Sequence, residues 1–200
     1  VLVGETYDEL GGSEYLKVEH GLVTGRPPAI DLELEAGVQK AVREAIRAGL
    51  VKSAHDCSEG GIAVALAECC IAGGVGADVH LHDDLPAVSS LFSESQSRIV
   101  VTCAEGDVDT LVDMLVAASV PYSVIGTVGG DRLRICERVD VSVEDLREAF
   151  EPTLERLVHG DETLQSEELV EGWSGDRPAA WPRNACVVEG RNLPWAFVSV

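Results

Sequence analysis

One short polar segment combines a carboxylate, a hydroxyl and two adjacent glycines: His55-Asp56-Cys57-Ser58-Glu59-Gly60-Gly61. A β-like run over residues 51–54 precedes it, and an apolar run with helical spacing follows it. This order predicts a strand, a loop and a helix. The free N–H groups and positive dipole at a helix start can hold an anion, and glycines let the backbone approach that anion closely. Ser58, Gly60 and Gly61 are therefore candidate ligands of a phosphate or nucleotide.

Asp56 changes the kind of anion site that this segment can form. A carboxylate repels a bound phosphate unless a cation lies between them, so Asp56 beside the glycines indicates a phosphate bound together with Mg²⁺. The alternative is that Asp56 and Ser58 only cap the helix, with Ser58 as N-cap, and that the glycines serve packing. The residues alone favour this alternative, because strand–loop–helix turns with capping residues are common.

A second polar segment, Ser93-Glu94-Ser95-Gln96-Ser97-Arg98, leads into an apolar run. Glu94, Ser95 and Gln96 offer acceptors and donors to a hydroxyl-rich or amide ligand, and Arg98 can pair with a carboxylate or phosphate. The alternative is that Arg98 pairs with Glu94 and that the turn is merely polar. His55 is expected to be a polar residue at a strand end and not a general base.

The elements that position these segments follow from apolar periodicity and predict an α/β fold, with a mixed sheet and helices packed on it. A long helix with acidic residues near its start and basic residues later is expected from about Asp31 to Gly49, and is interpreted as scaffold. Short helices are expected at 14–18 and 86–92, and longer ones after Gly61, at 107–118 and at 143–157. Strands are expected at 1–3, 51–54, 77–81, 99–103, 121–128 and 132–136.

The last forty residues differ from the rest of the chain. They contain all three tryptophans, at positions 173, 181 and 195, and show neither helical nor strand-like apolar periodicity. We therefore expect one folded lobe over residues 1–160 and an irregular tail over 161–200 that is either disordered or docked on another surface.

The composition excludes several classes of partner. With 35 acidic and 15 basic residues the formal charge is −20, so the surface repels nucleic acid and anionic lipid. No apolar run reaches the roughly 18 residues of a membrane span. The 6 cysteines show no metal-ligand spacing and are expected to be reduced, as in the cytoplasm. The charge is compatible with an ordinary acidic protein and with one adapted to a salty cytoplasm.

Several segments, in this order, resemble phosphoribosylformylglycinamidine synthase of purine biosynthesis. More narrowly they resemble its second C-terminal-type lobe, in a superfamily shared with aminoimidazole ribonucleotide synthetase, and the resemblance covers roughly residues 1–159. The segments are GETYDELGGSEYLKVEHG at 4–21, RPPAIDLELE at 26–35, HDCSEGGIAVALAE at 55–68, SESQSRIVV at 93–101 and IGTVGGDRLRI at 125–135.

The resemblance implies a cytoplasmic ligase that uses ATP and Mg²⁺ to convert formylglycinamide ribonucleotide to its amidine. Its implied partners are the other lobes of the synthetase and a glutaminase subunit or domain that supplies ammonia. Asp56 matches the family's metal-holding aspartate, and Glu94-Ser95-Gln96 matches its substrate-contacting turn. The family's catalytic residues lie outside this chain, so none is assigned here and the isolated chain is expected to be inactive.

Two alternatives remain beside this function. The first is a non-catalytic lobe that completes a pseudo-dimer, with the segment at Asp56–Gly61 as an auxiliary or vestigial site. The second is another ATP-dependent synthetase of the same superfamily, such as aminoimidazole ribonucleotide synthetase or a hydrogenase maturation factor. The segments GGSEY and SESQSR speak against this second alternative.

Overall fold

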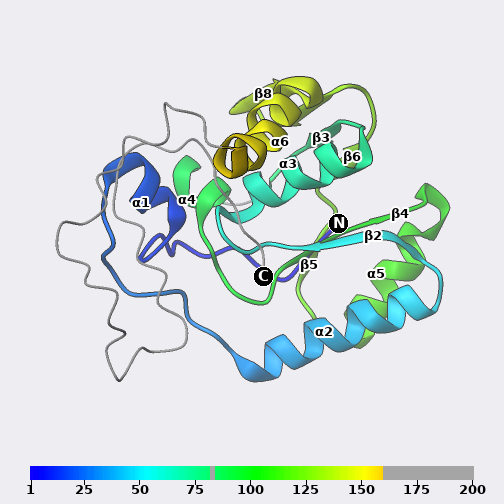
Figure 1. The fold of residues 1–200 in the computed structure, drawn as a ribbon. Helices are drawn as coiled ribbons and strands as arrows, with labels where there is room; N and C mark the ends of the chain where they lie inside the picture. Colours follow the sequence, from blue (N-terminus) through cyan, green and yellow to red (C-terminus); the bar gives the residue numbers. More distant parts are fainter. Residues whose placement is uncertain (82–83, 160–200) are drawn as a thin grey trace. The chain divides into compact units, whose positions relative to one another are not determined.

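The computed structural model describes residues 1–81 and 84–159 (Figure 1). Contacts divide the chain into one unit of Val1–Arg147 and another of Glu148–Val200. The tail expected at 161–200 lies outside the described residues, so the division at residue 160 stays a prediction. Within the described part, no helix is both long enough and apolar enough to cross a membrane.

The first unit contains two four-stranded sheets. The first sheet has the order β2-β4-β1-β5, and all of its neighbouring strands are antiparallel. The second has the order β6-β3-β7-β8, in which β3 and β7 run parallel and the other pairs antiparallel. The strands are β1 (Leu2–Val3), β2 (Val51–Asp56), β3 (Ala77–Val79), β4 (Ile99–Cys103), β5 (Tyr122–Ser123), β6 (Gly126–Val128), β7 (Arg132–Ile135) and β8 (Val139–Ser142).

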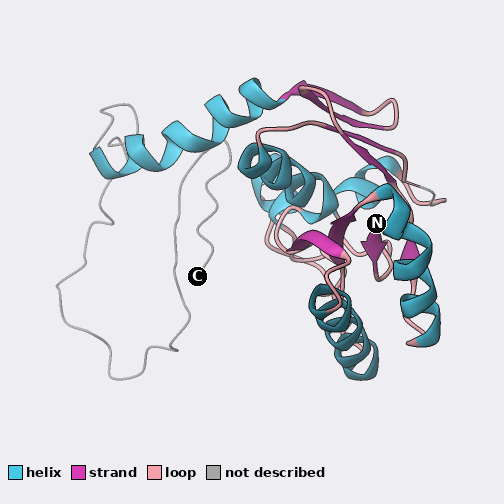
Figure 2. Ribbon diagram, turned by 90° about the vertical axis from the view of Figure 1, so that its right-hand side faces the viewer, coloured by secondary structure: helices cyan, strands magenta, loops and turns pink. Residues whose placement is uncertain are grey.

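Six α-helices and one short 3₁₀ turn connect the described strands. Figure 2 separates them from the strands by colour. They are α1 (Glu14–His20), α2 (Leu32–Arg47), α3 (Gly61–Gly73), α4 (Ala87–Phe92), the 3₁₀ turn η1 (Glu105–Asp107), α5 (Val108–Ala117) and α6 (Val143–His159).

The first sheet is buried on both faces at its central strands, β1 and β4, whose neighbouring residues point to opposite sides, whereas most of β2 is exposed. Leu2 and Val100 belong to one core cluster, while Val3 and Val101 belong to another. Helices α2 and α5 cover the second of these faces with small and aliphatic side chains (Figure 1). Burying each valine or leucine in this way contributes about 1.5–3 kcal/mol.

Helix α3 packs in the other cluster, where residues of the first and second sheets meet. Its buried residues share that cluster with Leu2 and Val100 of the first sheet and with Leu133 and Ile135 of the second. A helix covered on both sides needs apolar residues over most of its surface, and the sequence from Ile62 to Cys70 has this composition apart from Glu68. The sheets therefore lie on either side of α3.

The two main helices begin in different ways. The Asp31 side chain accepts hydrogen bonds from the N–H groups of Glu33 (2.9 Å) and Leu34 (3.1 Å), so the expected start of α2 is confirmed. The prediction that Ser58 is the N-cap of α3 is wrong. The N-cap is Gly60, which has φ +76° and makes no side-chain cap, because Gly60 and Gly61 both have left-handed backbone and delay the helix beyond Ser58.

The expected α/β class is confirmed, with the strands divided between two sheets. Strand β4 has the bounds that the sequence predicted, and α2 and α5 differ from prediction by one or two residues at each end. Strand β8 (Val139–Ser142) was not predicted.

A substitution at Gly61 would test how closely α3 approaches the chain before β4. A Cβ atom at Gly61 would lie 2.6 Å from the Ser93 carbonyl oxygen and 2.8 Å from that of Leu91, and Gly61 has φ +66°. We expect Gly61→Ala to lower the free energy of unfolding by at least about 3 kcal/mol, from backbone strain of about 1–2 kcal/mol plus steric overlap.

Gly49→Ala is the matched control for this prediction. Gly49 has a similar φ of +75°, but a Cβ atom there would meet nothing within 4 Å. The free energy of unfolding of Gly49→Ala should therefore fall only by the cost of backbone strain, about 1–2 kcal/mol. Urea unfolding of both variants measures the difference, and equal losses would contradict the close approach.

Candidate functional site

Strand pairing brings together the two polar segments that the sequence analysis singled out. Strands β2 and β4 are antiparallel, with Asp56 opposite Ile99, so the end of β2 lies beside the beginning of β4. The N–H of Cys57 also donates to the Arg98 carbonyl oxygen at 3.0 Å. The loop at 57–60 and the turn at 93–98 therefore form one site, although about forty residues separate them in the chain.

A pocket of about 410 Å³ lies at this junction. Three parts of the chain line it: the end of β2 with the loop after it, the turn before β4, and the first part of α2 with the residue Ile30 ahead of it. The lining residues are Ile30, Glu35, Val38, Gln39, Asp56, Cys57, Ser58, Glu59, Glu94, Gln96, Ser97, Arg98 and Ile99.

The N–H groups at the start of α3 are engaged by the chain itself. The Gly60 N–H donates to Glu94 Oε1 at 2.8 Å, and the Gly61 N–H donates to the Ser58 carbonyl oxygen at 3.1 Å. The Ser58 hydroxyl donates to the Asp56 carboxylate, and both of these side chains are exposed on the pocket wall. Asp56 and Ser58 are thus available to a ligand, whereas the glycine N–H groups already have partners.

His55 connects the end of β2 to α3. Its Nδ1 lies 2.7 Å from the Asp56 carbonyl oxygen, and since a carbonyl only accepts, Nδ1 carries a proton. Its Nε2 lies 3.4 Å from Glu68 Oε2. Burial raises the pKa of Glu68, and the neighbouring His55 opposes that rise. These contacts give His55 the role of a polar strand-end residue.

The turn before β4 is held by its own buried polar groups. Arg98 is only 2% exposed, and its guanidinium donates to the carbonyl oxygens of Ser95 (2.9 Å) and Ser93 (2.6 Å) and to Thr6 Oγ1 (2.9 Å). Burial lowers the pKa of Arg98. No ion pair joins Arg98 to Glu94, so the alternative that predicted this pair is wrong.

Ser95, Gln96 and Glu94 have different surroundings within this turn. Ser95 is fully buried, and its hydroxyl accepts from the Tyr7 N–H at 2.9 Å. Gln96 is exposed, and its Nε2 donates to the Glu94 carbonyl oxygen at 3.2 Å. Glu94 is partly buried and lines the pocket. Of the turn residues predicted to bind substrate, Glu94 and Gln96 therefore face the pocket with side chains that a ligand can reach.

The pocket is acidic. Four carboxylates line it, from Glu35, Asp56, Glu59 and Glu94, while the cation of Arg98 is buried and hydrogen-bonded within the turn. Burial raises the pKa of Cys57 to about 11, so this thiol stays neutral and is a poor nucleophile. The arrangement favours a ligand that is cationic, that carries hydrogen-bond donors, or that brings a metal ion with it.

Sequence reasoning missed the contribution of α2, which was interpreted as scaffold. Glu35 and Gln39 of this helix line the pocket, and Gln39 Nε2 donates to Glu35 Oε1 at 2.5 Å. Their spacing of four residues places them on one face of the helix. That polar pair, next to the buried Val38, was the available signal, but nothing local showed which part of the chain it would face.

The pocket offers few donor groups that could hold a metal ion. Among the described residues, no group of three or more histidine, cysteine, aspartate or glutamate side chains is arranged to hold a metal ion. Mg²⁺ is commonly held by only one or two carboxylates together with substrate phosphates and water. The exposed Asp56 carboxylate fits that limited role and does not form a closed protein site.

Comparison with known proteins bears on the resemblance seen in the sequence. A family described as AIR synthase related protein, C-terminal domain, matches residues 1–135. The phosphoribosylformylglycinamidine synthase subunit PurL of Moorella thermoacetica is 56% identical over 133 residues, which cover 66% of this chain and 18% of that protein. The PurL subunit of Anaeromyxobacter dehalogenans is 44% identical over 170 residues, covering 80% of this chain and 22% of that protein. The chain thus spans about a fifth of the length of these curated relatives.

Solved structures share the fold. Thermotoga maritima PurL complexed with FGAR superposes with a TM-score of 0.61 at 23% identity, covering 72% of this chain and 27% of that one. The same protein complexed with ATP gives a TM-score of 0.56 at 24% identity, covering 72% of this chain and 24% of that one. The resemblance to phosphoribosylformylglycinamidine synthase is confirmed by the sequence relatives, and the fold by these structures. Since the family match extends over residues 1–135, the chain belongs to the AIR synthase related protein C-terminal domain family.

Proposed function

We propose that the chain is a lobe of phosphoribosylformylglycinamidine synthase. On this proposal the whole protein is an ATP-dependent carbon–nitrogen ligase that converts formylglycinamide ribonucleotide to its amidine, with ammonia derived from glutamine. The observation that carries the proposal is the identity to curated PurL subunits, 56% over 133 residues and 44% over 170 residues. The family match over residues 1–135 also contains every residue that lines the pocket. The solved Thermotoga maritima relatives are complexes with ATP, ADP and FGAR, which supports these ligand classes.

Within this proposal some residues of the pocket contact the ligand, and others hold the contacting residues in place. Asp56 supplies one carboxylate to a Mg²⁺ ion bound with nucleotide phosphates, and the neighbouring Ser58 hydroxyl contacts the same ligand. Gly60 and Gly61 let the backbone come close to it. Gln96 reaches the substrate from the opposite turn, where Glu94 also lines the pocket, while Ser95 and Arg98 hold that turn in shape through their own hydrogen bonds. When bound, the metal ion neutralises phosphate charge.

The proposed enzyme is cytoplasmic and works with further components. Its partners are the other lobes of the same synthetase and a glutaminase subunit or domain that supplies ammonia. A solved structure of PurLQS from Thermotoga maritima supports such an assembly for that protein. The free thiols of Cys57, Cys69, Cys70, Cys103 and Cys136 suit a reducing compartment.

A second candidate function is a structural lobe without a working site. The engagement of the Gly60 and Gly61 N–H groups by Glu94 and Ser58 favours it, because a nucleotide phosphate would have to replace these bonds to use the helix start. The exposed Asp56 and Ser58 beside an acidic pocket favour the ligand site, since a purely structural lobe does not require them.

The first prediction of the proposal concerns the isolated chain. Because it spans about a fifth of its relatives, the 200-residue chain lacks most of the proposed enzyme. Incubated with ATP, Mg²⁺, formylglycinamide ribonucleotide and ammonia, it should form no amidine above background. Amidine formation, followed by chromatography against a boiled sample, would refute the assignment of catalysis to other lobes.

The second prediction concerns Asp56 in the longer protein proposed to contain the chain. Asp56 is exposed and does not cap α3, so Asp56→Ala should change the free energy of unfolding by no more than about 0.5 kcal/mol. Loss of the metal-directed carboxylate should weaken binding of ADP with Mg²⁺ by about tenfold or more, equivalent to ~1.4 kcal/mol. Calorimetric titration and a melting curve measure the two quantities.

Asp113→Ala is the control for the change in net charge. Asp113 is exposed on α5 and does not line the pocket, so this variant should bind ADP with Mg²⁺ as the wild type does. If Asp56→Ala also binds as the wild type does, the site is structural. If both variants weaken binding equally, the effect of Asp56 is one of overall charge and not of coordination.

A further inference from the structure

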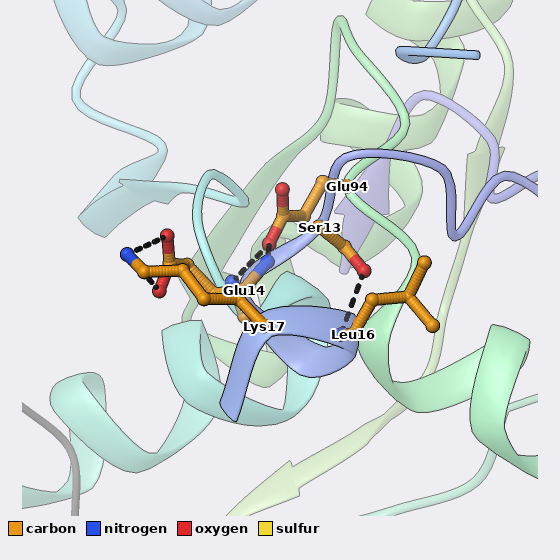
Figure 3. Close-up of polar contacts among 6 residues, drawn as sticks. Ser13, Glu14, Leu16, Lys17 and Glu94 are labelled. Carbon is orange, nitrogen blue, oxygen red and sulfur yellow. Dashed lines mark hydrogen bonds and ion pairs between the residues drawn. The ribbon is translucent and has the colours of Figure 1, made fainter. Parts of the chain in front are cut away.

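A single carboxylate oxygen holds the starts of two helices. Glu94 Oε1 accepts hydrogen bonds from the Glu14 N–H at 2.9 Å and from the Gly60 N–H at 2.8 Å. Glu14 is the first residue of α1, and Gly60 is the N-cap of α3. Figure 3 shows Glu94 against the start of α1, beside Ser13 and Glu14.

Other groups near these helix starts are already used. The N-cap Ser13 accepts from the Leu16 N–H, and the Glu14 carboxylate pairs with Lys17 at 2.9 Å (Figure 3). Gly60 has no side chain with which to cap α3. The first N–H groups of a helix have no acceptor within the helix itself and need one from elsewhere. The Glu94 carboxylate therefore supplies what neither helix start provides.

Glu94 also joins three segments that otherwise meet in pairs. The hydroxyls of Ser93 and Ser95 accept from backbone N–H groups of the loop before α1, at Glu9 (3.2 Å) and Tyr7 (2.9 Å). Backbone pairing links the turn to the loop before α3. In the described structure, the Glu94 side chain bonds both loops at once. Because residues 56–59, 94 and 96–99 line the pocket, this contact lies where the pocket walls are joined.

We propose that Glu94 is a positioning residue, whose Oε1 holds the loop at 57–60 and the start of α1 against the turn at 93–98, and so sets the spacing between the pocket walls that this loop and this turn form. It acts through the backbone of Gly60, and its effect depends on the reach of an acceptor oxygen. The link to ligand binding rests on the proposed function, whereas the link to the two N–H groups does not. Burial raises the pKa of Glu94 while the two backbone donors lower it, which fits a carboxylate with such partners.

Two conservative variants separate the effect of the length of the Glu94 side chain from the effect of its charge. Glu94→Gln keeps an oxygen at the same distance without the charge, and Glu94→Asp keeps the charge but is shorter by one methylene. Backbone amide hydrogen exchange of residues 14 and 60, measured by NMR in the 200-residue chain, reports the two bonds directly. We expect exchange at both amides to rise about tenfold or more in Glu94→Asp and in Glu94→Ala, and to stay within about threefold in Glu94→Gln.

Glu59→Ala is the matched control, because Glu59 lines the same pocket from the neighbouring loop and should leave both amides unchanged. Wild-type exchange in Glu94→Asp and Glu94→Ala would overturn the proposal, and so would Glu94→Gln exchanging as fast as Glu94→Asp. If Glu94→Ala does not fold, the comparison of amide exchange in Glu94→Gln and Glu94→Asp still decides the outcome.

A titration of ADP with Mg²⁺ into the longer protein then tests the consequence for the site. Glu94→Gln should bind within about threefold of the wild type and Glu94→Asp about tenfold more weakly. Weakened binding in Glu94→Gln with unchanged amide exchange would show direct ligand contact and overturn positioning as the role of Glu94. Absence of binding in the wild type itself would instead refute the proposed function, while the exchange result would stand.

Discussion

The close approach of Gly61 to the carbonyl oxygens of Leu91 and Ser93 is the contact on which the rest of the site depends. Helix α3, which is apolar apart from Glu68, has a sheet on either side of it, and its first residue, Gly61, passes close to the chain from α4 to β4. A residue with a Cβ atom does not fit there. The loop at 57–60 is consequently pressed against the turn at 93–98, and the pocket forms where they meet.

Local pattern predicted most of the elements, whereas their arrangement depended on contacts between distant residues. Asp31 followed by an amphipathic run is sufficient to mark the start of α2, and the apolar run from Ile99 to Cys103 is sufficient to mark β4. Strand β8 was missed because the turn before it, at 136–138, contains no glycine, proline or asparagine to signal it, although Cys136 has positive φ. The division into two sheets could not be predicted, because strand pairing is decided by burial on each face.

The candidate site shows the same limit at the level of side chains. Residue types singled out two polar segments, and the pairing of β2 with β4 is what places them together. Arg98 and Ser95 have the donors and acceptors of ligand-binding residues, yet both are buried and bonded within the chain. Sequence shows which groups can form hydrogen bonds and does not show which are already satisfied. The prediction that Ser58 caps α3 was wrong because two consecutive glycines with left-handed backbone move the start of the helix beyond Ser58.

The bonds that anchor the loop before α1 have a consequence for the order of folding. They connect residues 80 to 92 positions apart, from Glu14 with Glu94 to Thr6 with Arg98, and β1 pairs with β4 over a similar distance. Contacts of such separation form late because the intervening chain must first be closed. On a ribosome making about 5–20 residues per second, the N-terminal segment waits on the order of ten seconds for its partners to emerge. During that interval Leu2 and Val3 lack the strand that buries them, so this segment is accessible to chaperones while the rest is made.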